Sequence, residues 1–475
     1  MADTLDAVVV GSGPNGLAAA IELASAGRSV LVLERAETIG GGTRTEELTL
    51  PGFRHDVCSA VHPLAAGSPY LAALGLEGEG LELLYPEIEA AHPLDDGSAV
   101  AVRRSVSETA AELGADADAY QQLIGPLARD WPTLARFVLA PLGPPPRELS
   151  AAVRFSRSAL RSVEGVARST FTGERGRAVF AGMGAHSMRP LSSPASGAFA
   201  LVLLSLAHAV GWPVARGGSQ AIAEAMRRRL MALGGELQTG RDVRSLDELP
   251  SARTVLFDTS PRALDSICGE ALPLRYRSQL RRFRYGAGVF KLDYALSGPV
   301  PWRAPECRAA GTVHLGGTLA QIAASERAIA GGAHPDRPYV LVAQPSLIDA
   351  ERAPDGCHTL WAYCHVPSGS RVDMTDAIEA QIERFAPGFS ELVLARASRG
   401  PAAIEADNPN YVGGDINCGL ASLRQTLIRP ALRRSPYTTP NPRLFICSSA
   451  TPPGGGVHGM CGYHAARAAL SRVLR

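Results

Sequence analysis

Apolar and polar residues are patterned most clearly near the start of the chain, where three short segments follow one another. Residues 6–10 (DAVVV) are a β-branched run, residues 17–27 (LAAAIELASAG) have the alanine and leucine content of a helix, and residues 29–34 (SVLVLE) are a second apolar run. Short β-branched runs are typical of strands, and a glycine such as Gly27 is typical of the end of a helix. The pattern therefore predicts a strand, a helix and a second strand.

The rest of the chain divides into regions with different patterns. Residues 212–261 predict a glycine turn, a helix and two strands. Residues 442–474 predict an apolar strand, a Pro/Gly loop and a helix that begins near 459–462. Residues 75 to 210 are predicted to be mainly helical, and residues 270 to 435 alternate like strands.

Length, charge and cysteine content narrow the class of protein. A chain of 475 residues exceeds what one hydrophobic core usually serves, so two or three domains are expected. The 47 Lys and Arg residues nearly balance the 46 Asp and Glu residues, so no broad positive field is available and nucleic acid is not expected as a partner. The eight cysteines are scattered without a CxxC pair, as in a reduced cytoplasmic protein, and no metal site is predicted. Residues 1–4 show no basic region or cleavage site, so no signal peptide is expected.

Two segments bear on membrane contact. The apolar stretch at 196–212 stops at Pro213 and predicts a buried helix rather than a membrane span. The proline-rich segment at 139–150 predicts a hinge or an exposed loop. Four arginines then follow with the spacing of a basic amphipathic helix: Arg154, Arg157, Arg161 and Arg168. Such a helix lies on a membrane in some proteins and is a solvated face in others, so peripheral membrane association stays open beside a cytoplasmic location.

The loop after the first strand carries glycines at GxGxxG spacing. Gly11 permits the tight turn, Gly13 lets the backbone approach a pyrophosphate, and Gly16 lets helix and strand pack closely. The helix N-terminus presents unpaired N–H groups and a positive dipole to phosphates, and Pro14 suits its first turn. Glu34 ends the second strand, where a carboxylate accepts hydrogen bonds from both ribose hydroxyls and repels a 2′-phosphate. These features predict binding of the ADP-ribose of FAD or NAD rather than NADP.

A second glycine cluster distinguishes FAD from NAD. It lies within residues 35–47 (RAETIGGGTRTEE), where an NAD-binding domain would normally proceed into its next helix. Glycines allow this second loop to lie against an extended cofactor, and Arg44 and Thr45 supply a charge and a hydroxyl for phosphate or ribityl oxygens. The predicted helix near residue 459 would complete the site, because its N-terminus would stabilise the anion formed when flavin accepts hydride. The sequence therefore predicts FAD.

Three motifs together resemble the phytoene desaturase-like flavoproteins, within the amine oxidase and protoporphyrinogen oxidase superfamily. They are GSGPNGLAAAIELA at 11–24, ERAETIGGG at 34–42 and GGGVHGMCGYHAARAAL at 454–470. Segments in the middle of the chain resemble the branch known as pyridine nucleotide-disulphide oxidoreductase domain-containing protein 2; these are residues 285–302, 311–317, 344–367 and 408–416. No CxxxxC motif and no second glycine fingerprint are present, so neither a redox disulphide nor a separate NAD(P)H domain is expected.

The resemblance implies an α/β fold with two domains. A discontinuous, Rossmann-type FAD-binding domain would comprise residues 1–70, 212–265 and 436–475, and an α+β substrate domain with a mixed or antiparallel sheet would comprise residues 71–211 and 266–435. The implied cofactor-binding residues are Gly11, Gly13, Pro14, Asn15, Gly16, Glu34, Arg35, Gly41, Gly42, Thr43, Arg44, Thr45, Val243, Ala450, Gly459, Met460 and Cys461.

Three residues are candidates for catalysis. In the segment GVFKLDYAL (288–296), Lys291 and Asp293 share one side of a predicted strand, which faces either solvent or a cavity. If that side faces a cavity, Lys291 would position a water or a base near flavin N5. His458 and Tyr463 flank the predicted flavin helix and are expected to line the same space.

The predicted function is that of an FAD-dependent oxidoreductase. It would remove hydride from a C–H bond of a largely apolar small molecule, leaving a C=C or C=N bond, with oxygen or a quinone as electron acceptor. A flavin amine oxidase, a flavin-dependent hydroxylase or isomerase, and a flavin-binding protein without turnover are the alternatives. The sequence predicts no oligomeric state.

Overall fold

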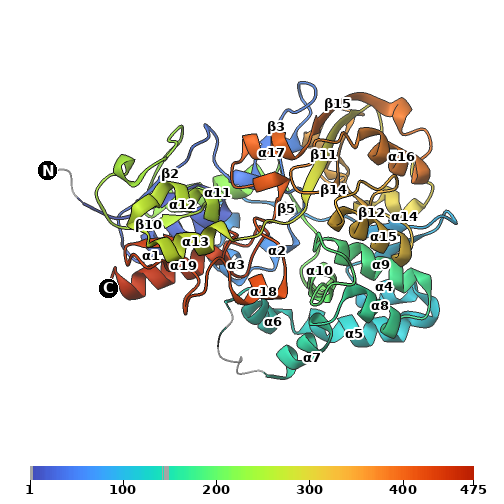
Figure 1. Cartoon of the computed structure of the whole chain (residues 1–475). Coiled ribbons are helices and arrows are strands. Elements are labelled where there is room, and N and C mark those ends of the chain that lie inside the picture. The colour runs from blue at the N-terminus through green and yellow to red at the C-terminus, as the bar shows by residue number, and fades with distance from the viewer. Residues whose placement is uncertain (1–3, 142, 144–148) are drawn as a thin grey trace.

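The computed structural model describes residues 4–141, 143 and 149–475, and this part of the chain folds around two large sheets (Figure 1). A five-stranded sheet has the order β16-β10-β1-β2-β9, and a seven-stranded sheet has the order β15-β11-β14-β13-β12-β6-β7. In Figure 1 the smaller sheet lies at the left and the larger one at the upper right. The predicted α/β fold with a Rossmann-type sheet and a mixed sheet is confirmed. Most of the predicted hinge at 139–150 lies outside the described residues.

All four neighbouring strand pairs of the five-stranded sheet are parallel. Its strands come from distant parts of the chain: β1 (Leu5–Val10), β2 (Val30–Leu33), β9 (Glu236–Gln238), β10 (Ala252–Phe257) and β16 (Leu444–Ile446). Alternate residues of β1 enter two different hydrophobic clusters, Ala7 and Val9 on one side, Val8 and Val10 on the other. Helices therefore cover both faces, as a parallel sheet requires. They are α1 (Pro14–Ser25), α11 (Gln220–Ala232) and α19 (Met460–Arg472) on one face, and α12 (Pro261–Cys268) and α13 (Leu274–Arg281) on the other.

Helices α1 and α19 lie side by side although they come from opposite ends of the chain (Figure 1). Gly462 of α19 permits this contact, because a Cβ at that position would collide with the backbone oxygen of Asn15 in α1. The side-chain amide of Asn15 also donates a hydrogen bond of 3.3 Å to Ser449 Oγ, just after β16. The predicted strand, loop and helix of residues 442–474 are thus β16 and α19, and they pack onto the first helix.

The seven-stranded sheet is mixed, with one parallel pair between β12 and β6. Its strands are β6 (Ile88–Pro93), β7 (Ala99–Val102), β11 (Gly288–Leu296), β12 (Ala310–Leu315), β13 (Val340–Ala343), β14 (His358–Val366) and β15 (Val393–Arg399). In β11, Phe290, Leu292 and Tyr294 enter a hydrophobic cluster with α16 (Thr375–Phe385). Lys291 and Asp293 lie on the opposite face of the same strand and are also buried. The predicted alternation along this strand is therefore correct.

Residues 75 to 210 are mainly helical, as predicted, but the strands β6 and β7 were not predicted there. Both strands are rich in alanine, which gives them no clear strand pattern, and β6 pairs with the distant strand β12. The helices of this region are α4 (Val106–Ala111), α5 (Ala117–Arg129), α6 (Trp131–Val138), α7 (Leu149–Ala159), α8 (Val163–Thr170), α9 (Glu174–Ala185) and α10 (Gly197–Ala209). The region from 270 to 435 likewise contains helices between its strands, namely α13, α14 (Pro305–Arg308), α15 (Leu319–Ala330), α16, α17 (Pro401–Asp407) and α18 (Leu423–Leu427).

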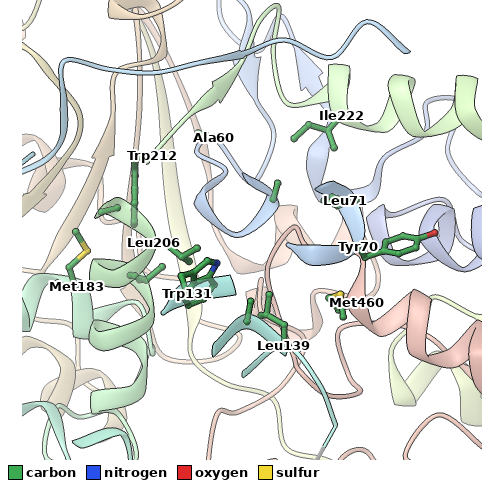
Figure 2. Packing of buried hydrophobic residues seen from close by; sticks show 14 of the residues in the cluster. Ala60, Tyr70, Leu71, Trp131, Leu139, Met183, Leu206, Trp212, Ile222 and Met460 are labelled. Carbon is green, nitrogen blue, oxygen red and sulfur yellow. The ribbon is translucent and has the colours of Figure 1, made fainter. Parts of the chain in front are cut away.

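The apolar stretch at 196–212 contains α10, whose Leu206 packs beside Trp131 and Trp212 in the core shown in Figure 2. Tyr70, Met460 and Ile222 belong to the same cluster, so one core joins the helical region to the parallel sheet. In the part of the chain that the structure describes, no helix has the length and hydropathy needed to span a bilayer. The arginines of the predicted basic helix are exposed, on α7, α8 and the turn between them.

Short elements connect these layers. The helices are α2 (Pro63–Ala66) and α3 (Pro69–Leu74), and the strand pairs are β3 (Thr45–Glu46) with β4 (His55–Asp56) and β5 (Leu83–Leu84) with β8 (Val214–Ala215).

Candidate functional site

A large cavity opens at the carboxyl edge of the parallel sheet, where β1, β2 and β10 end; we call it the first cavity. It contains about 1110 Å³ of space free of protein atoms, its open mouth included. The carboxyl edge of a parallel sheet is where α/β proteins bind ligands. Ten of the predicted cofactor-binding residues line it: Gly11, Gly13, Pro14, Asn15, Glu34, Arg35, Gly41, Gly42, Arg44 and Val243.

The glycine loop at the head of α1 has the close packing that its spacing predicts. A Cβ at Gly13 would lie 2.6 Å from Asp258 Oδ2, and a Cβ at Gly16 would collide with the backbone oxygen of Gly11. Gly13 is the N-cap of α1 and offers no side-chain cap, so the helix N-terminus faces the cavity with backbone groups. Such N–H groups and the helix dipole attract anions, so this end of α1 could act as a cradle for a phosphate group.

Glu34 is held in place at the cavity wall by three hydrogen bonds. Its carboxylate accepts from the backbone N–H of Ser12 at 2.8 Å, from the Ser12 hydroxyl at 2.7 Å and from the N–H of Ala36 at 2.9 Å. Two of these bonds go to Oε2 and one to Oε1, so Oε1 can accept one further bond. The position at the end of β2 and the fixed orientation suit recognition of a ribose.

The second glycine loop covers the first. A Cβ at Gly41 would approach the Cα of Gly13 to 3.2 Å, and a Cβ at Gly42 would collide with the hydroxyl of Tyr411. Arg44 lines the cavity and forms an ion pair with Asp407. The backbone N–H groups and the Arg44 guanidinium as donors, together with the Glu34 carboxylate as acceptor, fit an extended dinucleotide such as FAD.

Several predicted cofactor residues lie away from the wall of the first cavity. Thr43 donates a hydrogen bond of 2.8 Å to the backbone oxygen of Gly40, and Thr45 donates one of 2.9 Å to Asp56, so both hydroxyls hold the loop itself. Gly16, Ala450, Gly459, Met460 and Cys461 are likewise absent from this wall. Binding of a cofactor by these residues stays a prediction.

Asp258, at the end of β10, is a wall residue that the sequence analysis missed. Its Oδ2 accepts a hydrogen bond of 2.9 Å from the N–H of Gly16. Removal from bulk water raises the pKa of this carboxyl to about 7, and the nearby charge of Glu34 acts in the same direction. The available signal was its place directly after the apolar run of β10, but the pairing of β10 with β1, which puts Asp258 beside the glycine loop, leaves no mark in the sequence.

The segment 407–411 is a second part of the wall that was missed as a functional element. All five of its residues line the first cavity. The backbone oxygen of Asp407 accepts from Arg35, and Asn410 Oδ1 accepts a bond of 2.7 Å from the N–H of Ser260. Ser448 and Ser449 complete the wall from the other side. Residues 408–411 belong to a motif that carried the family resemblance, but the motif alone did not indicate a contact with this cavity.

A second cavity adjoins the first and shares Asp407 and Tyr411 with it. It is small, with an enclosed volume of about 10 Å³, which is room for about one water molecule, and it lies over β11, β14 and β15. Its remaining walls are Val57, Cys58, Val289, Lys291, Trp361, Tyr363, Arg399, Ile404 and Ile416. Of the two alternatives for the polar side of β11, the structure therefore shows a cavity for Lys291.

Lys291 is buried and forms an ion pair with Asp293 on the same strand. Burial lowers the pKa of Lys291 to about 8, against the opposing effect of Asp293. The ammonium also lies 5.6 Å from the ring centroid of Trp361. A lysine with its pKa this close to neutrality can hold or release a proton at physiological pH.

His458 and Tyr463 line neither cavity. His458 is buried, its Nε2 donates to the backbone oxygen of Gly454 at 3.2 Å, and its Nδ1 accepts from the N–H of Met460 at 3.1 Å. Burial lowers the pKa of His458 to about 4, so the ring is neutral at pH 7. Tyr463 packs on Tyr70 with ring centroids 5.0 Å apart. Both side chains secure the start of α19, and a catalytic role for them stays a prediction.

The sequence of this chain is similar to those of known oxidoreductases. Residues 9–74 match the family model described as an NAD(P)-binding Rossmann-like domain. The chain is 28% identical over 542 aligned positions to pyridine nucleotide-disulfide oxidoreductase domain-containing protein 2 of Rattus norvegicus, which covers 97% of this chain and 92% of the relative. A shorter match, 36% identical over 104 positions, joins 22% of this chain to 19% of one polypeptide of the limonene dehydrogenase of Castellaniella defragrans.

The fold is also that of a flavin amine oxidase. The structure of putrescine oxidase with putrescine bound superposes with a TM-score of 0.61 at 17% identity, over 99% of both chains. At this identity the likeness shows the fold alone.

Proposed function

We propose that this chain is an FAD-dependent oxidoreductase. It is similar along its length to pyridine nucleotide-disulfide oxidoreductase domain-containing protein 2, and it has the flavin amine oxidase fold. Its substrate would be a largely apolar small molecule that loses hydride from a C–H bond. When bound, FAD supplies the two-electron acceptor for such a reaction. The observation that carries the proposal is the adjacency of the two cavities, one suited to a dinucleotide and one small and partly apolar.

The first cavity supports FAD as the cofactor. Glu34 would bind the ribose hydroxyls, the N-terminus of α1 would face the pyrophosphate, and Val243 lies on the wall near Glu34 where an adenine would be held. The wall continues past this region to Gly42, Arg44 and Ser449, which would contact the part of FAD beyond the pyrophosphate. An NAD-type site needs no such second loop.

The second cavity supplies the groups that would act on a substrate. Apolar side chains such as Val289, Ile404 and Ile416 line it and limit the access of water to Lys291. Lys291 would hold a proton or an ordered water at its Nζ, and Asp293 keeps that ammonium in place. A dry surrounding strengthens the electrostatic effect of both groups.

Two relatives bear on the type of oxidation. The limonene dehydrogenase is named for a hydrocarbon substrate, whereas putrescine oxidase was solved with a diamine. Dehydrogenation of a C–C bond and oxidation of an amine are therefore the first proposal and its alternative. Formation of an imine with hydrogen peroxide would favour the amine oxidase, and insertion of oxygen that depends on NADPH would favour a hydroxylase.

The decisive experiment uses the full chain reconstituted with FAD. We expect the protein to bind FAD stoichiometrically and, without oxygen, to lose its visible flavin absorption when exposed to a fractionated metabolite extract. Oxygen or a quinone should restore that absorption, and the fraction identifies the substrate. The control is Glu34→Ala, which removes the ribose acceptor and should bind FAD weakly. A yellow protein that no fraction reduces would indicate a flavin-binding protein without turnover.

A further inference from the structure

The segment of residues 423–432 is oriented with polar side chains inward and apolar side chains outward. Gln425 and Arg429 are buried: Gln425 donates a hydrogen bond of 2.9 Å to the backbone oxygen of Leu420, and Arg429 donates one of 2.8 Å to that of Ser449. The large apolar side chains of the segment are exposed, by 40% for Leu423, 68% for Leu427, 37% for Ile428 and 70% for Leu432. A cluster of exposed apolar side chains marks a surface that contacts a partner.

The end of α7 adds a further apolar side chain to this surface. Leu160 directly follows α7 and is 63% exposed. Arg189 donates a hydrogen bond of 2.7 Å to the backbone oxygen of Ala421 and one of 3.4 Å to that of Pro194. The next residue, Ala195, donates from its N–H to the backbone oxygen of Leu160 at 3.0 Å.

These bonds hold the end of α7 next to the segment that contains α18, and both lie in the lower part of Figure 1. We call the exposed side chains together the apolar patch; its members are Leu160, Leu423, Leu427, Ile428 and Leu432.

The surroundings of the apolar patch are basic, although the charge of the whole chain is balanced. The last 60 residues, 416–475, contain eight arginines and no Asp or Glu. Arg424 and Arg434 within this stretch, and Arg157 on α7, are exposed and form no ion pair with any described residue. Apolar side chains beside unpaired cations suit the headgroup region of an anionic bilayer, where acyl chains cover the former and lipid phosphates attract the latter.

We propose that the apolar patch docks on the surface of an anionic phospholipid bilayer. A second copy of the chain would bring the same arginines face to face across a two-fold axis, which like-charge repulsion disfavours. Nucleic acid would satisfy the arginines but would leave the leucines in water. The patch lies outside the walls of both cavities, so docking goes beyond the proposed oxidation and does not depend on FAD.

The test is flotation of the full chain with vesicles, in parallel with and without FAD. One set of vesicles contains phosphatidylcholine alone, and the other contains equal parts of phosphatidylcholine and phosphatidylglycerol. We expect at least about tenfold stronger binding to the anionic vesicles, because each cation at such a surface contributes about fivefold. Raised salt should reduce this preference, since it screens the charges. FAD should change neither result.

Two double substitutions separate the apolar contribution from the charged one. Leu427→Ser with Leu432→Ser removes the two most exposed leucines of the patch and should weaken binding to both vesicles by about tenfold or more. Arg424→Gln with Arg434→Gln should weaken binding to the anionic vesicles by about tenfold or more and leave binding to phosphatidylcholine unchanged.

The matched control is Leu394→Ser with Arg371→Gln. Leu394 is 51% exposed on β15 and Arg371 is exposed after β14, so both lie on the other large sheet region, away from α18. This variant should change binding less than about twofold. Circular dichroism of every variant verifies that the fold is retained.

The outcomes distinguish this inference from the proposed function. Absence of vesicle binding by the natural chain, equal binding to the two kinds of vesicle, or full binding by the leucine variant would overturn the inference. A natural chain that sediments as a dimer, with a leucine variant that sediments as a monomer, would also overturn it, because a second copy would then cover the patch. A chain that takes up no FAD would contradict the proposed function and leave the docking result standing.

Discussion

The carboxyl of Asp258 lends itself to a quantitative test, because its surroundings oppose its ionisation. The pKa of this carboxyl rises from 3.8 to about 7, chiefly through removal from water, although its hydrogen bond from the N–H of Gly16 opposes the rise. Asp258→Asn keeps the shape and an oxygen that accepts from Gly16. The substitution therefore removes the ionisation and little else.

The sign of the effect follows from proton binding. Between pH 4 and 7 the folded chain without FAD retains the proton of Asp258 while the unfolded chain has lost it, so stability falls as pH rises through this window. The shift of the pKa from 3.8 to about 7 corresponds to about 4 kcal/mol at most above pH 7. Water in the cavity solvates part of the carboxylate and reduces this value. Asp258→Asn should not lose stability in this pH range. The free energy of unfolding of the variant, minus that of the natural chain, should therefore increase from pH 4 to pH 8.

Urea unfolding of both proteins without FAD, followed by circular dichroism at several pH values, measures the difference directly. Asp242→Asn is the control, because Asp242 is an exposed carboxylate on the wall of the same cavity. FAD binding gives a second readout: the variant should bind FAD more tightly at pH 8 and equally at pH 5, because a carboxylate at the head of α1 repels a pyrophosphate. Parallel pH profiles for the two proteins would refute the reasoning.

Three further predictions follow from single contacts. Gly13→Ala places a methyl group 2.6 Å from Asp258 Oδ2 and should weaken FAD binding by about tenfold or more in fluorescence titration; unchanged affinity would contradict the cradle. Arg352→Met leaves Asp56, its fully buried partner at 3.0 Å, without a counter-charge, and should lower the free energy of unfolding by about 3–5 kcal/mol; a loss below about 1 kcal/mol would count against this account. Lys291→Met should slow anaerobic flavin reduction about tenfold or more with FAD affinity unchanged, and an unaltered rate would remove Lys291 from the mechanism.

The sequence was sufficient for the parts of the fold whose signals are local. The strand, helix and strand of residues 5–33 follow from a β-branched run, a glycine turn and an alanine-rich segment, all within a short stretch of chain. The strand β6 was missed because its sequence, IEAAHP, carries no clear pattern and its pairing depends on β12, which lies far away in the sequence. Non-local pairing of this kind leaves little trace in the composition of a short segment.

In the candidate site, too, residues with a local sequence signal were predicted, and residues whose place depends on strand pairing were not. Gly11, Gly13 and Glu34 were found because their spacing along one βαβ unit is diagnostic, and all three line the first cavity. The alternation in β11 predicted that Lys291 leaves the apolar face, but only the register with β15 shows that Arg399 lies opposite it. Asp258 was missed because its role depends on a pairing between strands that local pattern does not reveal.

The contact between α1 and α19 has a consequence for biosynthesis. Asn15 and Ser449 touch across 434 positions of chain, and β16 forms an edge of the same sheet that begins with β1. A ribosome therefore exposes the phosphate-binding loop long before it delivers the segment that closes the site. Contacts of such long range form slowly and only once both partners are available. Uptake of the proposed FAD by the completed site would thus follow translation, and a nascent chain arrested before β16 would carry the glycine loop without the finished pocket.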